Sequence, residues 1–89
     1  MIVRWLDSAV DDMERIDAWL SSLEYVNPQG VRGKIYDTVA KLERLGDIGR
    51  PWRKGSRAVA VRNAPYVIVF RVFDDHLAIV SVLHQAGIR

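Results

Sequence analysis

Apolar residues in the first half of the chain recur with helical spacing. They lie every three or four positions at Ala9, Met13, Ile16, Leu20 and Leu23, which places them on one face of an amphipathic helix. Ser8, with Asp11 three residues later, predicts a capping box at the start of this helix. The short apolar run at residues 2–6 predicts a first strand ahead of it.

A second helical pattern follows Asn27 and Pro28. Asn27 is a preferred N-cap residue, and Pro28 suits the first helical position because its missing N–H is unpaired there in any helix. Gly46 predicts the end of this helix. Two helices so close in sequence predict an antiparallel hairpin that needs a second layer to cover its apolar face. That face consists of Val31, Ile35, Val39, Leu42 and Leu45.

The pattern changes to strands from residue 56 onward. Three runs, at residues 56–62, 66–73 and 77–84, are rich in β-branched residues, and residues with turn chemistry separate them. Such short links predict antiparallel neighbours. The predicted fold is therefore α+β with the order β-αα-βββ, a single domain over residues 1–89. In it, an antiparallel helix hairpin packs on one face of a small, mainly antiparallel sheet.

Composition removes several classes of function. The 89-residue chain contains no cysteine, which excludes disulfides, thiolate catalysis and cysteine-ligated metals. His76, in a turn, and His84, at a strand end, are too few for an ordinary metal site, and no cofactor is expected. No run approaches the roughly 18 apolar residues of a membrane span, and the N-terminus lacks an apolar signal core. These features predict a soluble cytoplasmic protein without membrane contacts.

Charge is distributed unevenly along the chain. Residues 1–49 carry six Lys and Arg against nine Asp and Glu, whereas residues 50–89 carry seven against two. The segment 50–62 holds five cations and no acid, namely Arg50, Arg53, Lys54, Arg57 and Arg62. Such a segment predicts a surface for polyanions or for an acidic protein. The alternative is a solvated basic loop, because charge runs are commonly solvated.

Four sequence phrases resemble the toxin subunits of the RelE/ParE superfamily of bacterial type II toxin–antitoxin systems. In chain order they are RWLDSAVDD, LGDIGRPWRKGSR, PYVIVFRV and SVLH, and the resemblance covers residues 4–84. Its most specific part is Gly49-Arg50-Pro51, then Arg57, Pro65-Tyr66-Val67 and Val82-Leu83-His84. The resemblance implies a cognate antitoxin protein that wraps the domain and silences it.

The superfamily divides into two mechanisms. RelE-like members cut mRNA in the ribosomal A site, whereas ParE-like members poison DNA gyrase. Cleavage of mRNA requires a base, an acid and cationic donors for the phosphorane. Arg57 and Arg71 are candidate donors and His84 is a candidate acid or base. A second proton-transfer group is missing from residues 50–62, and no Tyr follows His84.

This incomplete catalytic set, the Trp-Leu-Asp-Ser-Ala opening and the Gly-Arg-Pro element favour the ParE-like branch, which inhibits gyrase by binding. A RelE-like ribosome-dependent endoribonuclease and an inactive toxin-derived binding module are the alternatives. The residues expected to contact the target are Arg50, Trp52, Arg53, Lys54, Arg57, Arg62, Tyr66 and Arg71.

Several of these residues also have ordinary structural interpretations. Arg71 is either a target contact or a paired cation of the strand, and Tyr66 is either a stacking platform or a core aromatic. His84 is either a catalytic acid or base or a hydrogen-bonded residue at the end of a strand.

Other expectations concern packing. Trp5 and Trp19 are expected to be packed and Trp52 exposed. Gly49 and Gly55 are expected to permit turns with positive φ. The acidic first half of the first helix is expected to be a solvated face.

Overall fold

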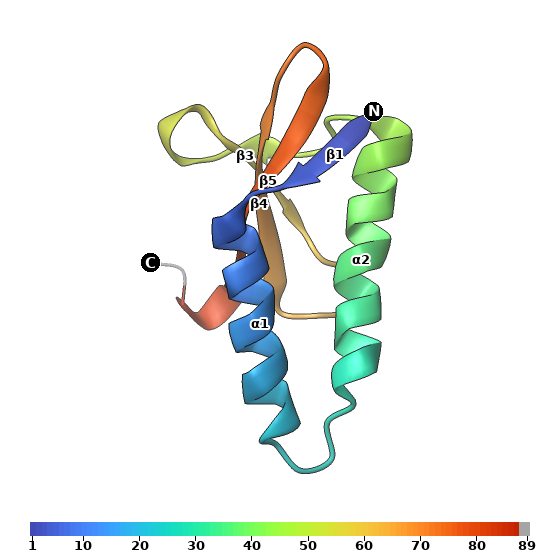
Figure 1. Cartoon of the computed structure of the whole chain (residues 1–89), viewed down its shortest axis with the longest axis vertical. Coiled ribbons are helices and arrows are strands. Elements are labelled where there is room, and N and C mark those ends of the chain that lie inside the picture. Colours follow the sequence, from blue (N-terminus) through green and yellow to red (C-terminus); the bar gives the residue numbers. More distant parts are fainter. Residues whose placement is uncertain (88–89) are drawn as a thin grey trace.

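In the computed structural model, which describes residues 1–87, two helices cover one face of a five-stranded sheet (Figure 1). The predicted β-αα-βββ order and α+β class are confirmed. The sheet gains a two-residue strand that the apolar pattern did not predict. The elements are β1 (Ile2–Trp5), α1 (Asp7–Ser21), α2 (Pro28–Leu45), β2 (Arg50–Pro51), η1 (Arg53–Gly55), β3 (Arg57–Ala60), β4 (Tyr66–Val72), β5 (His76–His84) and η2 (Gln85–Gly87).

The strand order in the sheet is β1-β5-β4-β3-β2. β1 runs parallel to β5, with Val3 opposite Leu77, and every other neighbouring pair is antiparallel. The parallel pair is possible because the whole helix hairpin connects β1 to the rest of the chain. A register irregularity interrupts the β4–β5 ladder between Val69 and Phe70. The β4–β5 hairpin extends beyond the helices at the top of Figure 1.

The hydrophobic core lies between the helix hairpin and the sheet. Both predicted helical faces contribute to it, together with alternate residues of the strands. The predicted burial is wrong for the last residue of each face. Leu23 is 38% exposed beyond the end of α1, and Leu45 is 60% exposed in the last turn of α2. The core consists of Ala9, Met13, Ile35, Val39, Leu42, Val61, Tyr66, Ile68, Phe70, Leu77, Ile79 and Val82.

The two predicted helix starts differ in outcome. The Asn27 side chain accepts a hydrogen bond from the Gln29 N–H at 3.1 Å, so the cap of α2 is confirmed. The capping box at Ser8 is wrong, because α1 begins at Asp7 and its N-cap residue is Leu6. Ser8 Oγ instead donates to the Val80 carbonyl at 2.6 Å. This tertiary bond fastens the first turn of α1 to β5.

The acidic half of α1 is not uniformly solvated, contrary to the prediction. One oxygen of Asp12 accepts from Ser81 Oγ at 2.7 Å and from the Val82 N–H at 2.9 Å, and the other oxygen pairs with Arg15. Asp17 pairs with Arg32 of α2 at 2.6 Å. These carboxylates join α1 to β5 and to α2, because a half-buried N–H needs an acceptor once water is excluded.

Trp5 lies in the environment predicted for it, whereas Trp19 and His76 do not. Trp5 packs against the core and lies 5.7 Å from the Tyr36 ring, as expected for a packed residue. Trp19 is 50% exposed, so its predicted burial is wrong. His76 is the first residue of β5 and not a turn residue, and its hydrogen bond to Asp75 holds the pKa of that carboxyl below its usual range.

Candidate functional site

The segment from residue 50 to 57, called the basic loop below, is a tightly bonded projection from the end of the sheet. The Trp52 N–H donates to the Ser56 carbonyl at 2.8 Å, and the buried Ser56 donates its N–H and its hydroxyl to the Arg53 carbonyl. Lys54 and Gly55 both adopt positive φ, at 53° and 77°. The prediction for Gly55 is therefore confirmed, whereas Gly49 has no positive φ.

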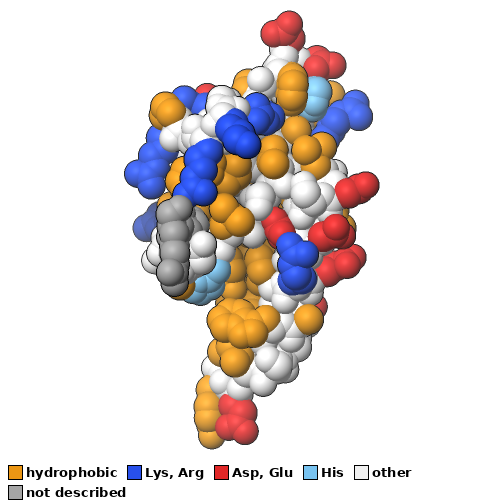
Figure 2. Space-filling model, turned by 90° about the vertical axis from the view of Figure 1, so that its left-hand side faces the viewer, with side chains coloured by type: hydrophobic (Ala, Val, Ile, Leu, Met, Phe, Trp, Pro, Cys, Tyr) orange, Lys and Arg blue, Asp and Glu red, His pale blue; other side chains and the backbone are white. Residues whose placement is uncertain are grey.

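The basic loop presents several of its predicted cations to solvent. Arg50, Arg53 and Lys54 are exposed, and the Arg53 guanidinium lies 5.5 Å from the centre of the Trp52 ring, within cation–π range. Trp52 itself is only half-exposed, so it supports Arg53 and is a less open contact than predicted. Most of the Lys and Arg side chains in Figure 2 gather in its upper part, while Asp and Glu lie along its right-hand edge and at its top and bottom ends.

Arg57 anchors the base of the loop and is not a free phosphate donor. Its Nε lies 3.0 Å from an oxygen of Asp47, and its Nη2 donates to the Gly49 carbonyl at 2.6 Å. Both partners belong to the connection between α2 and β2, just outside the acid-free segment. Because the guanidinium already has a carboxylate and a carbonyl, Arg57 has fewer donors left for a target, and its contact with a target stays a prediction.

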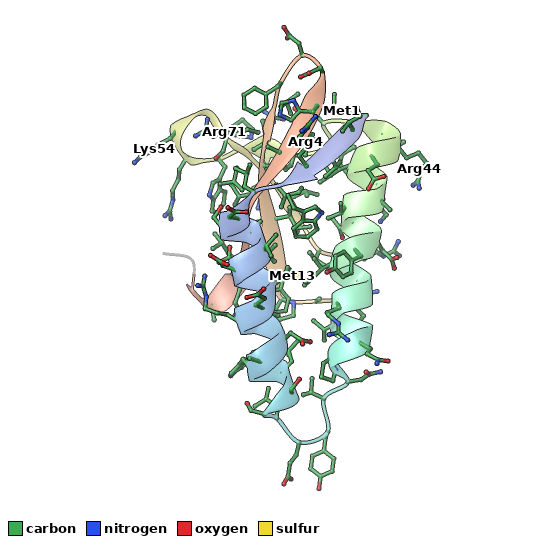
Figure 3. All side chains as sticks on the ribbon, viewed as in Figure 1. Met1, Arg4, Met13, Arg44, Lys54 and Arg71 are labelled. Carbon is green, nitrogen blue, oxygen red and sulfur yellow. The ribbon has the colours of Figure 1, made fainter. Side chains whose placement is uncertain are left out.

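Arg71 supports the basic loop from beneath. Its Nη2 donates to the Lys54 carbonyl at 2.9 Å, and Figure 3 shows Arg71 beside the loop that carries Lys54. The side chain is half-buried. Arg57 is paired with Phe70, so Arg57 and Arg71 project from opposite faces of the sheet, since neighbouring residues of a strand alternate. Arg71 therefore holds Lys54 in place.

Two predicted contact residues lie away from the basic loop. Arg62 follows β3 at the far end of that strand and lines a separate cavity with residues of α2. Tyr66 is 1% exposed and belongs to the core, so the core interpretation is correct and the stacking platform is wrong for this conformation. The linear sequence grouped both residues with the loop only because they are close in number.

A largely apolar cleft lies where α1 crosses the ends of β4 and β5. It has a volume of about 370 Å³, and its floor includes the edge-on contacts of His84 with Tyr66 and Trp19, at 5.2 and 5.8 Å between ring centres. His84 Nδ1 accepts from the Ala86 N–H at 3.0 Å. Burial raises the pKa of the Tyr66 phenol, so its hydroxyl stays protonated. We call this the His84 cleft; it is lined by Arg15, Ile16, Trp19, Tyr66, His84 and Ala86.

The buried Tyr66 hydroxyl has no hydrogen-bond partner among the described residues. Sequence reasoning missed the His84 cleft because its walls come from the first helix and the last strand. Trp19 was the available signal, because it lies outside the repeating apolar face of the first helix, but it was expected to be packed and is 50% exposed.

The three candidate catalytic residues do not converge. His84 is opposite Tyr66, and Arg71 is opposite Ala78. Tyr66 and Arg71 are five positions apart on β4, which at about 3.3 Å per residue separates His84 from Arg71 by roughly 16 Å. Arg57 lies near the Arg71 end but on the other face. No single phosphate group can contact all three side chains in this arrangement.

No helix within residues 1–87 has the length and apolar character needed to cross a membrane. The same residues contain no group of three or more His, Asp or Glu side chains placed to hold a metal ion.

Several solved structures, including chains of toxin–antitoxin systems, share this fold. A chain of the chromosomal ParDE toxin–antitoxin system of Pseudomonas aeruginosa has a TM-score of 0.72 and 22% identity over 94% of this chain and 95% of its own. The RelBE2 toxin–antitoxin complex of Mycobacterium tuberculosis has a TM-score of 0.64 and 20% identity, over 93% of this chain and 95% of its own. YafQ of Escherichia coli has a TM-score of 0.67 and 14% identity, over 96% of this chain and 93% of its own. At these identities the likeness shows the fold alone.

Sequence comparison identifies the family. No curated protein sequence matches the chain significantly. In contrast, the family model described as "ParE toxin of type II toxin-antitoxin system, parDE" matches residues 3–89. Because this match spans nearly the whole chain, and the fold agrees with it, the protein belongs to the ParE toxin family of type II toxin–antitoxin systems.

Proposed function

We propose that this toxin inhibits DNA gyrase by binding it, without hydrolytic chemistry of its own. The observation that carries the proposal is the contrast between the two candidate sites. The basic loop presents Arg50, Arg53 and Lys54 on a hydrogen-bonded frame, whereas the candidate catalytic residues are divided between two ends and two faces of the sheet. The match to a ParE family model supports the same choice.

The basic loop is suited to binding because its shape is set before a partner arrives. Bonds from Trp52, Ser56 and Arg71 fix the backbone around Lys54. The bond from Arg57 to Gly49 fixes the base of the loop. A preorganised loop loses little conformational entropy on binding. Its exposed cations attract acidic protein surface or DNA phosphates over several ångströms and raise the association rate. In the proposed mechanism, the bound toxin stalls gyrase at the stage where DNA is cleaved.

A supercoiling assay with purified gyrase tests this proposal. We expect added toxin to inhibit supercoiling and to cause cleaved plasmid to accumulate, since a stalled enzyme retains the broken DNA. Supercoiling that continues unchanged at saturating, folded toxin contradicts the proposal. If growth of cells expressing the toxin is also unaffected, the result favours an inactive binding module.

A ribosome-dependent endoribonuclease is the second candidate function, and the His84 cleft is the observation that favours it. An imidazole can serve as a general acid or base, and the buried Tyr66 hydroxyl beside His84 is a donor without a partner in the described structure. If this function is correct, His84→Ala slows mRNA cutting in a translation extract at least about 100-fold, the usual range for a general acid or base. The control is His76→Ala, because His76 lies at the opposite end of β5 from His84. Equal cutting by both variants removes His84 from the mechanism.

A cognate antitoxin is the expected inhibitor of either activity. The solved relatives include toxin–antitoxin complexes, among them YoeB–YefM of Staphylococcus aureus. In this chain, an acidic antitoxin segment would neutralise the basic loop by direct contact. The exposed Trp19 and the apolar lining of the His84 cleft offer an anchor for an apolar antitoxin side chain. The hetero-oligomer would then block both candidate surfaces.

A further inference from the structure

The solvent-facing side of α2 forms a second basic surface that the sequence pattern did not reveal. A cavity of about 370 Å³ lies between this helix and the turn from β3 to β4. We call it the α2 pocket. Four cations and one acid line it, giving a net charge of +3. These charged residues are Lys34, Lys41, Arg44, Arg62 and Asp37.

One hydrogen bond joins the two walls of the α2 pocket, and a second lies within α2. Lys34 Nζ donates to the Asn63 carbonyl at 3.0 Å, and Asn63 adopts a positive φ of 60° in the turn. The buried Thr38 donates its hydroxyl to the Lys34 carbonyl at 3.1 Å. An ammonium group has three hydrogens. Lys34 is therefore held in place by one hydrogen bond and keeps two donors for a ligand.

The pocket cations have no carboxylate partner in the described structure. The ion pairs found in residues 1–87 involve Arg15, Arg32, Arg57 and His76, and none of these residues lines the α2 pocket. Asp37 lines the pocket but forms no ion pair within 4.0 Å with a pocket cation. The positive charge is thus uncompensated inside the protein, which makes the pocket an anion site.

The α2 pocket is separate from the basic loop. Figure 3 shows Arg44 on the outer side of α2 and Lys54 at the opposite side of the molecule. Arg62 belongs to the α2 side, because it follows β3 at the end away from the loop. The two basic surfaces therefore do not form one continuous patch around a single ligand group.

We propose that the α2 pocket binds the phosphodiester backbone of a nucleic acid. Ala40 is the one apolar residue of its lining, whereas a protein partner needs buried apolar or aromatic anchors for affinity. Phosphate contacts need only cations, and the guanidinium groups of Arg44 and Arg62 match phosphate oxygens. The ten positions from Lys34 to Arg44 span about 15 Å of helix, which corresponds to roughly four nucleotides at 3.4 Å per step. The inference goes beyond the proposed function, since this contact needs no gyrase.

Fluorescence anisotropy with a labelled 20-base-pair DNA duplex, full-length toxin and no gyrase tests the proposal. We expect the triple variant Lys41→Gln, Arg44→Gln, Arg62→Gln to bind at least about 30-fold more weakly at roughly 50 mM NaCl. Its slope of log affinity against log salt should fall by about 2 to 3, because each lost phosphate contact removes close to one unit. Circular dichroism establishes that the variant is folded.

The control removes a cation that belongs to neither basic surface. Arg4 is exposed on β1 and does not line the α2 pocket. Arg44→Gln alone should lower the salt slope by about 1, whereas Arg4→Gln should change it by less than about 0.3. An equal fall in slope for both single variants overturns the proposal, as does wild-type toxin that fails to bind DNA. A poly-glutamate chain that competes as well as DNA overturns it in favour of an acidic protein ligand. None of these outcomes depends on gyrase inhibition.

Discussion

Replacing Arg50 and Lys54 together with Glu is expected to reduce inhibition of gyrase supercoiling about 100-fold. Both side chains are exposed and neither forms an ion pair in the described structure. If each makes one charge-assisted contact with the target, its loss costs about 1.5 kcal/mol, and two such losses multiply to about 100-fold. The measurement is the toxin concentration that halves the supercoiling rate.

The matched control for each single change is Arg4→Glu. Arg4 is an exposed cation of β1, near the opposite end of the sheet order from the basic loop. Arg4→Glu makes the same change in charge. We expect it to raise the half-inhibitory toxin concentration less than about threefold, because distant exposed charges are screened. Lys54→Glu or Arg50→Glu alone should raise the half-inhibitory toxin concentration about tenfold. If Arg4→Glu costs as much, the basic loop is not the contact surface; melting temperatures close to wild type exclude misfolding.

The basic surface was predictable from the sequence, but its individual members were not. A count of charges between residues 50 and 62 located Arg50, Arg53 and Lys54 correctly at the surface. The same count could not identify Arg57 and Arg71 as supports. Arg57 pairs with Asp47 and with the Gly49 carbonyl, and Arg71 donates to the Lys54 carbonyl. Backbone acceptors have no signature in composition. Whether a cation is free depends on where acceptors meet in space.

The helical faces were predictable where one face repeats over several turns. Met13, Ile35 and Leu42 are buried as their spacing indicated. The pattern failed where tertiary contacts decide the outcome. Ser8 bonds to Val80 of a distant strand and caps nothing, and Trp19 lies open against His84 because the last strand ends beneath it. No local rule connects residues 19 and 84, so the His84 cleft required the fold.

Gly49 shows how a residue can be necessary without an unusual backbone angle. The sequence suggested positive φ, but the structure gives a different reason for glycine. A Cβ at this position would lie 2.6 Å from Cζ of Phe70 and 2.8 Å from the carbonyl oxygen of Ala58. Phe70 and Ala58 are both buried. The backbone at Gly49 therefore lies so close to Phe70 and Ala58 that only a hydrogen atom fits as its side chain. The Gly49 carbonyl accepts the hydrogen bond from Arg57 at the same place.

Gly49→Ala is accordingly expected to lower the free energy of unfolding by about 3 kcal/mol, because a backbone oxygen and a packed ring must both shift. Urea denaturation measures it as a lower midpoint at an unchanged slope. Gly33→Ala is the control, since a Cβ there meets nothing within 4 Å in the interior of α2. That change should stabilise the protein by about 0.5 to 1 kcal/mol through helix propensity. A Gly49→Ala variant as stable as wild type shows that β2 has room to move, and the close approach would then not explain the glycine.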